Sequence, residues 1–309
     1  MQRRASDVAA ATAVPVLPVP GPFDPDQTAA YRAWRDAKLA ACPARLSDLI
    51  VAIDDPRALK PAEREALVDR VRRANMVVYV SPVVAADKDI PRLLGHQVGL
   101  DRLDRNWLAD DDGISQVKVA AVGTRGEFIP YTDHPIRWHT DGYYNPPERR
   151  IRAMVLHCVS NAATGGENAL LDHELAYVML RDENPDFARA LMQPDAMTIP
   201  ARSDADGVAR AAQSGPVFHV DPESGALHMR YTARTRSIEW KQEPTVLAAV
   251  ACLERLLAGP SPHIHRLTLL PGMGLLCNNV LHARTGFNDD PSRPRLLYRG
   301  RYYDRIAGT

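Results

Sequence analysis

The feature that most constrains the fold is a series of short β-strand signals separated by Pro, Gly and Asn turns. The predicted strands lie near residues 116–122, 152–159, 169–171, 216–220, 227–231, 264–270 and 275–278, with helical inserts near 172–192 and 245–258. The 25 prolines favour turns over a long helical bundle. Strands and helices do not alternate regularly, which argues against a doubly wound parallel sheet. We therefore predict an α+β fold built on a sandwich or jelly roll.

The N-terminal part of the chain has a different sequence pattern, with helix signals in place of most of the strand signals. Residues 1–25 are rich in Ala, Val and Pro without a strand or helix period, so a flexible extension is expected. A helix is predicted over 26–41, and a second opens at Pro61, whose fixed φ suits a first helical turn. The β-branched run Met76–Val80 predicts a buried strand, and a third helix follows over 90–98. Residues 26–309 are expected to form a single domain.

Charge and composition limit the classes of partner. The 38 Lys+Arg balance 38 Asp+Glu, so bulk electrostatics give no case for nucleic-acid or anionic-membrane binding. No apolar run approaches the length of a membrane span, and the four cysteines have no metal-binding or disulfide spacing. We expect a cytoplasmic protein that acts on a small molecule, without nucleic acid or membrane partners, and compatible with a homo-oligomer.

The densest chemical signal is the segment Trp138-His139-Thr140-Asp141-Gly142. Because residues i and i+2 of a strand share a face, His139 and Asp141 would point to one spot. They would then supply two of the three ligands of a 2-His-1-carboxylate iron site. The competing interpretation is a solvated histidine followed by a turn-forming Asp.

A second candidate ligand ends a distant strand. The segment from Leu270 to Phe287 contains a Pro-Gly turn, a strand and then His282. His282 could complete the ligand set from that strand. Alternatively, it is a core histidine bonded to a backbone carbonyl.

The third signal is the alternation in Arg295-Leu-Leu-Tyr-Arg-Gly-Arg301, which places Arg295, Arg299 and Arg301 on one strand face. If that face is exposed, the arginines protect an edge strand from aggregation. If it lines a barrel interior, a buried guanidinium needs an anion, and its planar fork matches a carboxylate.

Together these segments resemble the taurine dioxygenase / 2,4-dichlorophenoxyacetate dioxygenase (TauD/TfdA) family of Fe(II)- and 2-oxoglutarate-dependent oxygenases. The resemblance extends over about residues 61–305. It rests on four motifs: the H-x-D of His139 and Asp141, Gly165-Gly-Glu-Asn168, the P-G-x-x-L-x-x-x-N-x-L-H-x-R-T-x-F block ending at Phe287, and Arg295-Leu-Leu-Tyr-Arg299.

The resemblance implies a double-stranded β-helix, a jelly-roll or cupin-like barrel with flanking helices. It implies that His139, Asp141 and His282 bind Fe(II), that O₂ and 2-oxoglutarate are co-substrates, and that Arg295 holds the distal 2-oxoglutarate carboxylate. Asn168 stands where the family commonly has Thr, and its amide could donate the same hydrogen bond. The interval from His282 to the arginine is longer than the family's, so Arg293 is a rival of Arg295.

Further residues are expected around the substrate. Tyr143, Tyr144 and Asn145 directly follow the iron motif and could wall the pocket, although aromatic pairs after a strand often serve packing alone. Arg299 is expected to meet an acidic group of the substrate. The alternative is an internal salt bridge with a carboxylate such as Glu167 or Glu239.

This ligand set favours hydroxylation of a C–H bond in a small acidic or zwitterionic substrate, with release of succinate and CO₂. Because Asp141 is a carboxylate where related halogenases carry a small residue, hydroxylation is favoured over halogenation, while desaturation and cleavage stay open. The alternative from another class is a cupin-like metal- or anion-binding protein without turnover. A metal-dependent hydrolase is disfavoured because the H-E-x-x-H pattern is missing.

Overall fold

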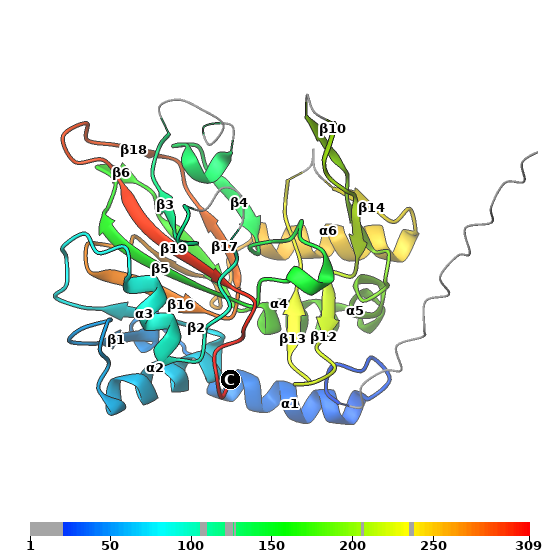
Figure 1. Ribbon diagram of the computed structural model, residues 1–309. Helices are drawn as coiled ribbons and strands as arrows, with labels where there is room; N and C mark the ends of the chain where they lie inside the picture. Colours follow the sequence, from blue (N-terminus) through cyan, green and yellow to red (C-terminus); the bar gives the residue numbers. More distant parts are fainter. Residues whose placement is uncertain (1–20, 106–109, 121–125, 127, 205–206, 235–237) are drawn as a thin grey trace, which may run out of the picture.

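A computed structural model describes residues 21–105, 110–120, 126, 128–204, 207–234 and 238–309. Its largest sheet has six strands in the order β1-β2-β16-β5-β19-β3. β1 and β2 pair in parallel, and the other neighbours pair antiparallel. The bounds are Ile50–Ala52 (β1), Met76–Val80 (β2), Ser115–Val117 (β3), Ala153–Ser160 (β5), Met273–Cys277 (β16) and Leu296–Tyr302 (β19). Figure 1 shows β19, in red, beside β5 across the middle of this sheet.

One face of the six-stranded sheet is covered by helices α2 (Pro61–Ala74) and α3 (Ile90–Gln97). Val77 and Tyr79 of β2 pack toward these helices, whereas Met76 and Val78 belong to the core on the opposite face. β2 is thus buried on both faces, which explains its continuous apolar sequence.

A second sheet lies against that opposite face. It has the order β15-β7-β17-β4, with bounds His265–Leu267, Asn168–Leu171, Leu281–Arg284 and Ile136–His139. Leu170 and Leu267 of this sheet share a core with Met154, Leu275 and Leu297 of the six-stranded sheet. The two sheets therefore pack together through interleaved apolar side chains, as sandwiches do.

The outer face of the second sheet is covered by a helical layer. α4 (His173–Glu183), α5 (Pro185–Leu191) and α6 (Pro244–Ala258) enclose the largest core, together with α1 (Thr28–Ala41) at the bottom of Figure 1. Leu281 of β17 and Trp138 of β4 contact this core. Because strand side chains alternate, the next residues, His282 and His139, point to the inner side, between the two sheets.

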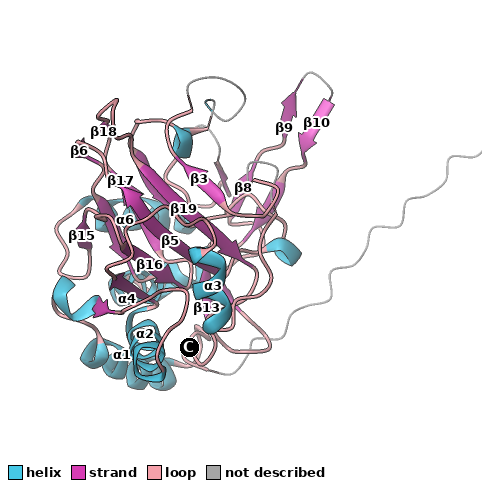
Figure 2. Ribbon diagram, turned by 60° about the vertical axis from the view of Figure 1, so that its left-hand side comes forward, coloured by secondary structure: helices cyan, strands magenta, loops and turns pink. Residues whose placement is uncertain are grey.

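Small sheets and short helices complete the described structure. β6 (Thr164–Gly165) pairs with β18 (Phe287–Asn288), β12 (Phe218–Val220) with β13 (Leu227–Met229), and β9 (Arg202–Asp204) with β10 (Gly207–Arg210). β11 (Gln213–Gly215), β8 (Met197–Ile199) and β14 (Glu239–Trp240) form a three-stranded sheet. The 3-10 turns span Leu46–Leu49, Ile129–Tyr131 and Pro147–Arg149. The β9–β10 hairpin projects from the body of the molecule (Figure 2).

The predicted α+β class is confirmed. The predicted helical insert over 172–192 is two helices, because Asn184 ends α4 and caps α5, which begins at Pro185. Residues 1–20 of the expected flexible extension lie outside the described residues. Within 21–25 the expectation is wrong, since Phe23 is buried against Trp34 and Tyr177. Among the described residues, no helix is long and apolar enough to cross a membrane.

Candidate active site

The two histidines of the predicted ligand set are cross-strand neighbours. His282 of β17 is directly opposite His139 of β4 in the antiparallel ladder. Their rings lie with centroids 4.1 Å apart. Antiparallel pairing thus brings together two residues that are distant in sequence, as directly opposite side chains share one face.

Asp141 completes the cluster from the turn that follows β4. One ligand atom each from His139, Asp141 and His282 lies within 4.8 Å of the others. Gly142 adopts φ +69°, and a Cβ at this position would collide with Ile151, so the chain can turn sharply only with glycine here. Among the described residues this is the one cluster of three His, Cys, Asp or Glu side chains that could hold a metal ion.

Asn279 fixes the backbone of Asp141. Its side-chain oxygen accepts a hydrogen bond from the Asp141 amide at 2.8 Å, and its Nδ2 donates to the carbonyls of Asp141 at 2.9 Å and Ile151 at 2.7 Å. Asn279 itself has φ +49°, a conformation that asparagine tolerates better than most residues. Asn279 was part of the recognised motif, but its role was not apparent from sequence.

The electrostatic state of the cluster suits a divalent cation. Nδ1 of His139 lies 2.9 Å from the Arg137 carbonyl, and Nδ1 of His282 lies 3.0 Å from that of Val280. These contacts favour the tautomer that leaves Nε2 free to coordinate. Burial and then the neighbouring His282 lower the pKa of His139 to about 3. Burial would raise the pKa of Asp141, but Arg299, Arg301 and the two histidines together outweigh it and hold the pKa below its usual range. Two neutral imidazoles and one carboxylate are the donor set that Fe(II) takes in facial triads.

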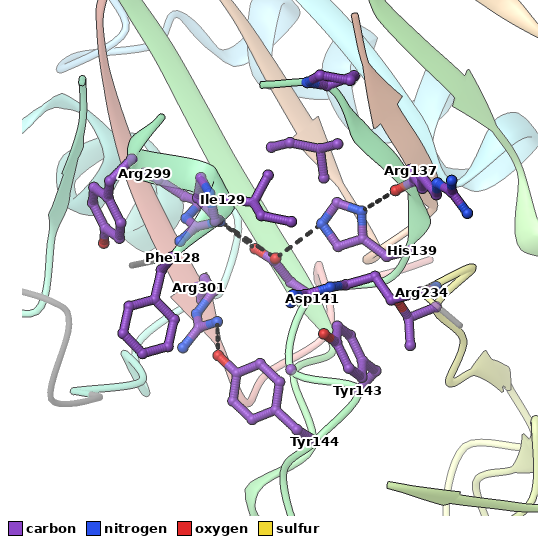
Figure 3. A pocket seen from close by; sticks show the side chains of 16 residues that line it. Phe128, Ile129, Arg137, His139, Asp141, Tyr143, Tyr144, Arg234, Arg299 and Arg301 are labelled. Atoms are coloured by element: carbon purple, nitrogen blue, oxygen red, sulfur yellow. Dashed lines mark hydrogen bonds and ion pairs between the residues drawn. The ribbon is translucent and has the colours of Figure 1, made fainter. Parts of the chain in front are cut away.

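Arg299 departs from its expected role. Its Nη1 lies 3.2 Å from Oδ2 of Asp141 (Figure 3), so the internal salt bridge is present, with a partner other than Glu167 or Glu239. The expectation that a substrate anion is the main partner of Arg299 is therefore corrected. The β19 register accounts for this, because it places Arg299 opposite Leu156 of β5, beside the ligand cluster.

Arg301 is held in the same way by protein groups. It donates to Oδ2 of Asp104, which is fully buried, and at 3.0 Å to the hydroxyl of Tyr144. The predicted sharing of one face by Arg295, Arg299 and Arg301 is present in the structure, since all three line cavities between the sheets.

A small cavity beside His282 and His139 is lined by Arg295 and Asn168. Arg295 is 5% exposed, and its Nη1 has no hydrogen-bond partner among the described residues. Its guanidinium stacks on Phe287, with 5.1 Å from Cζ to the ring centroid. A buried cation without a carboxylate fits an anionic co-substrate such as 2-oxoglutarate. Arg293, the rival, is exposed and does not line this cavity.

Arg284 is a second arginine in this cavity that sequence reasoning did not single out. It donates from Nη2 to the carbonyls of Thr132 and His134 at 2.8 and 2.6 Å. Burial and then the charge of Arg295 lower its pKa to about 9. Its place in the H-x-R-T motif, two residues after His282, was the available signal.

A larger cavity of about 270 Å³ opens on the other side of the cluster. Tyr143 and Tyr144 line it as expected, and Phe128, Arg137 and Arg234 join them. In Figure 3, Arg299 and Arg301 lie on one side of Asp141, whereas Arg137 and Arg234 lie on the other. Nothing in the sequence around Phe128 marks it as a site residue, because it arrives from a loop.

Asn145 does not line this cavity and is a correction to the expected substrate wall. Its Nδ2 donates to the Arg149 carbonyl at 2.8 Å, and its amide bonds to the Gly142 carbonyl. Asn145 thus closes the turn that carries the two tyrosines.

The paired sheets, the His-Asp-His cluster and the unpaired buried arginine define the class of protein: an Fe(II)- and 2-oxoglutarate-dependent oxygenase. The comparisons with known proteins agree. A family model described as "Taurine catabolism dioxygenase TauD, TfdA family" matches residues 50–301, and the chain belongs to this family.

Two curated relatives are similar in sequence over part of the chain. A uridine-5'-phosphate dioxygenase from Streptomyces sp. is 34% identical over 59% of this chain and 67% of its own length. A second uridine-5'-phosphate dioxygenase, from Amycolatopsis sp., is 32% identical over 53% of this chain and 60% of its own length. The alignments thus span about two thirds of these relatives or somewhat less.

Solved structures share the fold at low identity. An asparagine oxygenase in complex with Fe(II), 2S,3S-3-hydroxyasparagine and succinate has a TM-score of 0.58 at 16% identity, over 90% of this chain and 85% of its own. A taurine dioxygenase from Burkholderia xenovorans has a TM-score of 0.55 at 17% identity, over 84% and 89%. The alternative of a barrel without turnover finds no support in these comparisons.

Proposed function

We propose that the protein couples 2-oxoglutarate decarboxylation to oxidation of a C–H bond in a small phosphate-bearing substrate, with a nucleoside 5'-monophosphate such as uridine-5'-phosphate as the first candidate. The observation that carries the proposal is the 270 Å³ cavity beside the ligand cluster, which combines aromatic rings with arginines. The names of the two curated relatives point to the same substrate class.

The cavity offers both kinds of contact that a nucleotide needs. The rings of Phe128, Tyr143 and Tyr144 provide apolar faces on which a base can stack. Among the described residues, Arg137 and Arg234 have no ion-pair partner, unlike Arg299 and Arg301. These two guanidinium groups are therefore available to a phosphate, which they can contact through paired hydrogen bonds.

Within this proposal, His139, Asp141 and His282 hold Fe(II), which with 2-oxoglutarate and O₂ supplies the oxidising power. Arg295 and Asn168 bind the distal carboxylate of 2-oxoglutarate. Arg299 holds the Asp141 carboxylate in place and balances its charge. Tyr143 and Tyr144 exclude water from the substrate side. We also propose that the two main sheets form the double-stranded β-helix of this family, which the shared inter-sheet core supports.

The test is succinate formation from 2-oxoglutarate with uridine-5'-phosphate, uridine, asparagine or taurine present. Uridine-5'-phosphate is expected to stimulate succinate release over the uncoupled rate, and uridine to do so only at higher concentration. Arg234→Ala is expected to raise the apparent KM for uridine-5'-phosphate about tenfold and to leave that for uridine unchanged, since a charge-assisted bond contributes about 1.5–3 kcal/mol. An equal rise of the apparent KM for uridine-5'-phosphate and for uridine in Arg234→Ala would contradict a nucleotide substrate. Succinate release that only taurine or asparagine stimulates would contradict it as well.

A further inference from the structure

A second cavity lies on the far side of the turn formed by residues 142–147. The turn separates it from the substrate cavity, and Tyr143 lines both. Its basic lining residues are Arg150, His219, His228 and Arg230. No function assigned above uses these four residues.

The two histidines are placed there by strand pairing. His219 of β12 and His228 of β13 are directly opposite each other in the antiparallel hairpin. Their neighbours Phe218 and Met229 face the helical core, so the imidazoles project from the opposite face. Figure 1 shows this hairpin, in yellow, beside the turn that follows β4.

Arg150 is the unpaired charge of the cavity. No hydrogen bond or ion pair links its guanidinium to another described residue, although it is only partly exposed. Arg230, by contrast, donates to the carbonyls of Tyr143, Met197 and Gln213. Carbonyls satisfy its hydrogen bonds but do not neutralise its charge.

No carboxylate compensates this positive charge from within the cavity. The nearby Asp221 is paired with Arg152 at 2.7 Å. Asp141 is the one acidic residue among the lining residues, and its carboxylate is engaged with Arg299 and the metal-ligand cluster on the other side. The cavity is therefore electropositive.

The pKa values of these basic groups agree with a positive electrostatic potential in the cavity. Burial and then the charge of Arg150 lower the pKa of His219 to about 4 and the pKa of Arg230 to about 10. The same two causes, in the same order, lower the pKa of His228. An anion bound among these side chains would relieve the repulsion between them.

We propose that this second cavity binds a small tetrahedral oxyanion of the phosphate class, with Arg150 as its principal charged partner. The volume of about 40 Å³ accommodates roughly three water-sized groups, which suits an oxyanion and excludes a nucleoside. The imidazoles can donate hydrogen bonds to the bound oxygens. Gly142 and Tyr143 line both cavities, so a bound anion would stabilise the turn that also lines the substrate cavity.

This proposal does not depend on the substrate of the enzyme. It is tested by titrating inorganic phosphate into the full chain by isothermal calorimetry, without 2-oxoglutarate or nucleotide. The wild type is expected to bind phosphate at this cavity, in addition to the phosphate that Arg137 and Arg234 can take in the substrate cavity, and Arg150→Ala to weaken the affinity of this site at least tenfold. Because no described residue forms a hydrogen bond or ion pair with the Arg150 guanidinium, its removal should leave the melting temperature in phosphate-free buffer unchanged.

Two controls separate this cavity from other positive surfaces. Arg32→Ala removes an exposed arginine of α1, and Arg234→Ala removes one from the substrate cavity. Both variants are expected to keep the phosphate site that Arg150→Ala weakens, and saturating uridine-5'-phosphate should not displace phosphate from that site. Unchanged binding in Arg150→Ala, loss of the Arg150-dependent site in Arg234→Ala, its displacement by the nucleotide or no binding by the wild type would each overturn the proposal.

Discussion

Single side chains determine whether the site can hold iron, and His282 is the sharpest test because only strand pairing brings it to His139. His282→Ala removes one of three ligands, so anaerobic Fe(II) titration should show binding weakened more than about 100-fold, beyond the usual effect of losing an outer partner. His134→Ala is the matched control, since its side chain is 76% exposed. Equal Fe(II) affinity in the two variants would remove His282 from the ligand set.

Arg295 and Arg293 lie two positions apart, and Arg295 is buried whereas Arg293 is exposed. Ala variants of the two residues can therefore be compared directly for 2-oxoglutarate binding. Arg295→Ala is expected to raise the apparent constant for 2-oxoglutarate tenfold or more, because a charge-assisted bond to a carboxylate contributes about 1.5–3 kcal/mol. Arg293→Ala should leave that constant near the wild-type value, because this residue is exposed and lies outside the cavity. The reverse pattern in steady-state kinetics would transfer the role to Arg293.

Asn279 is predicted to position Asp141 without touching the metal. Asn279→Ala deletes three buried hydrogen bonds to the backbone. We expect the free energy of unfolding to fall by about 1–3 kcal/mol and Fe(II) affinity to fall about 10- to 100-fold. Chemical denaturation and metal titration measure the two effects. A loss of stability with unchanged metal affinity would limit Asn279 to a structural role.

The candidate site was predictable from sequence where the relevant geometry is local. The i, i+2 spacing of His139 and Asp141 and the alternation of Arg295, Arg299 and Arg301 follow from strand periodicity. The partner of Arg299 was not predictable, since its contact with Asp141 depends on how two distant strands approach. Phe128 and Arg137 were not predicted for the same reason, because loops and sheet pairing bring them to the cavity. Arg234 was a sequence candidate for the site, with a surface charge as the alternative, and it lines the cavity.

At the scale of elements, α1 is anchored to α4 through a buried charge. Lys38 of α1 is 7% exposed, and its Nζ lies 2.6 Å from Asp172 and 2.5 Å from Glu174. Lys38→Ala would leave these carboxylates buried without their cation, which costs about 3–5 kcal/mol of unfolding free energy. Arg35→Ala, which breaks surface pairs of the same helix, should cost about 1 kcal/mol or less. Denaturant unfolding of both variants makes the comparison.

The same ion pair sets a pH dependence. Burial would raise the pKa of Asp172, but the charges of Lys38 and His173 together with the hydrogen bonds from Lys38 and Asn75 outweigh it, and the pKa is lowered from its ordinary 3.8. The stabilisation is therefore fully present above that value and is lost as the pH falls through the lower pKa of the folded state. The stability difference between wild type and Lys38→Ala should shrink as the pH falls from neutrality, because the buried Asp172 of the variant, without its cation, takes up a proton before the wild-type carboxylate does. A difference that grows on acidification would contradict this assignment.

Element boundaries were predictable where a chemical signal marks them. Pro61 opens α2, and the β-branched run Met76–Val80 is a strand with the predicted bounds. The burial of Phe23 was not predicted, because it depends on contacts with Trp34 of α1 and Tyr177 of α4. The Ala- and Pro-rich sequence before Phe23 has no periodicity that would indicate these contacts.

At the scale of the whole molecule, the six-stranded and four-stranded sheets pack together and helices cover their outer faces. β4, the turn after it and β17 supply the proposed metal ligands, and β19 with the residue before it supplies the arginines from the facing sheet. The fold class followed from strand spacing, whereas the strand order β1-β2-β16-β5-β19-β3 did not, because it depends on pairings between distant segments. This arrangement places the two cavities proposed for the substrate and for 2-oxoglutarate on two sides of one cluster.

The most direct test of the account is the ratio of succinate formed to uridine-5'-phosphate consumed by the purified protein with Fe(II), 2-oxoglutarate and O₂. We predict a ratio close to one, with no consumption of the nucleotide when 2-oxoglutarate is omitted or when His282 is replaced by Ala. Consumption of the nucleotide without succinate, or succinate release that the nucleotide does not stimulate, would contradict the proposed coupling of this site to a nucleotide substrate.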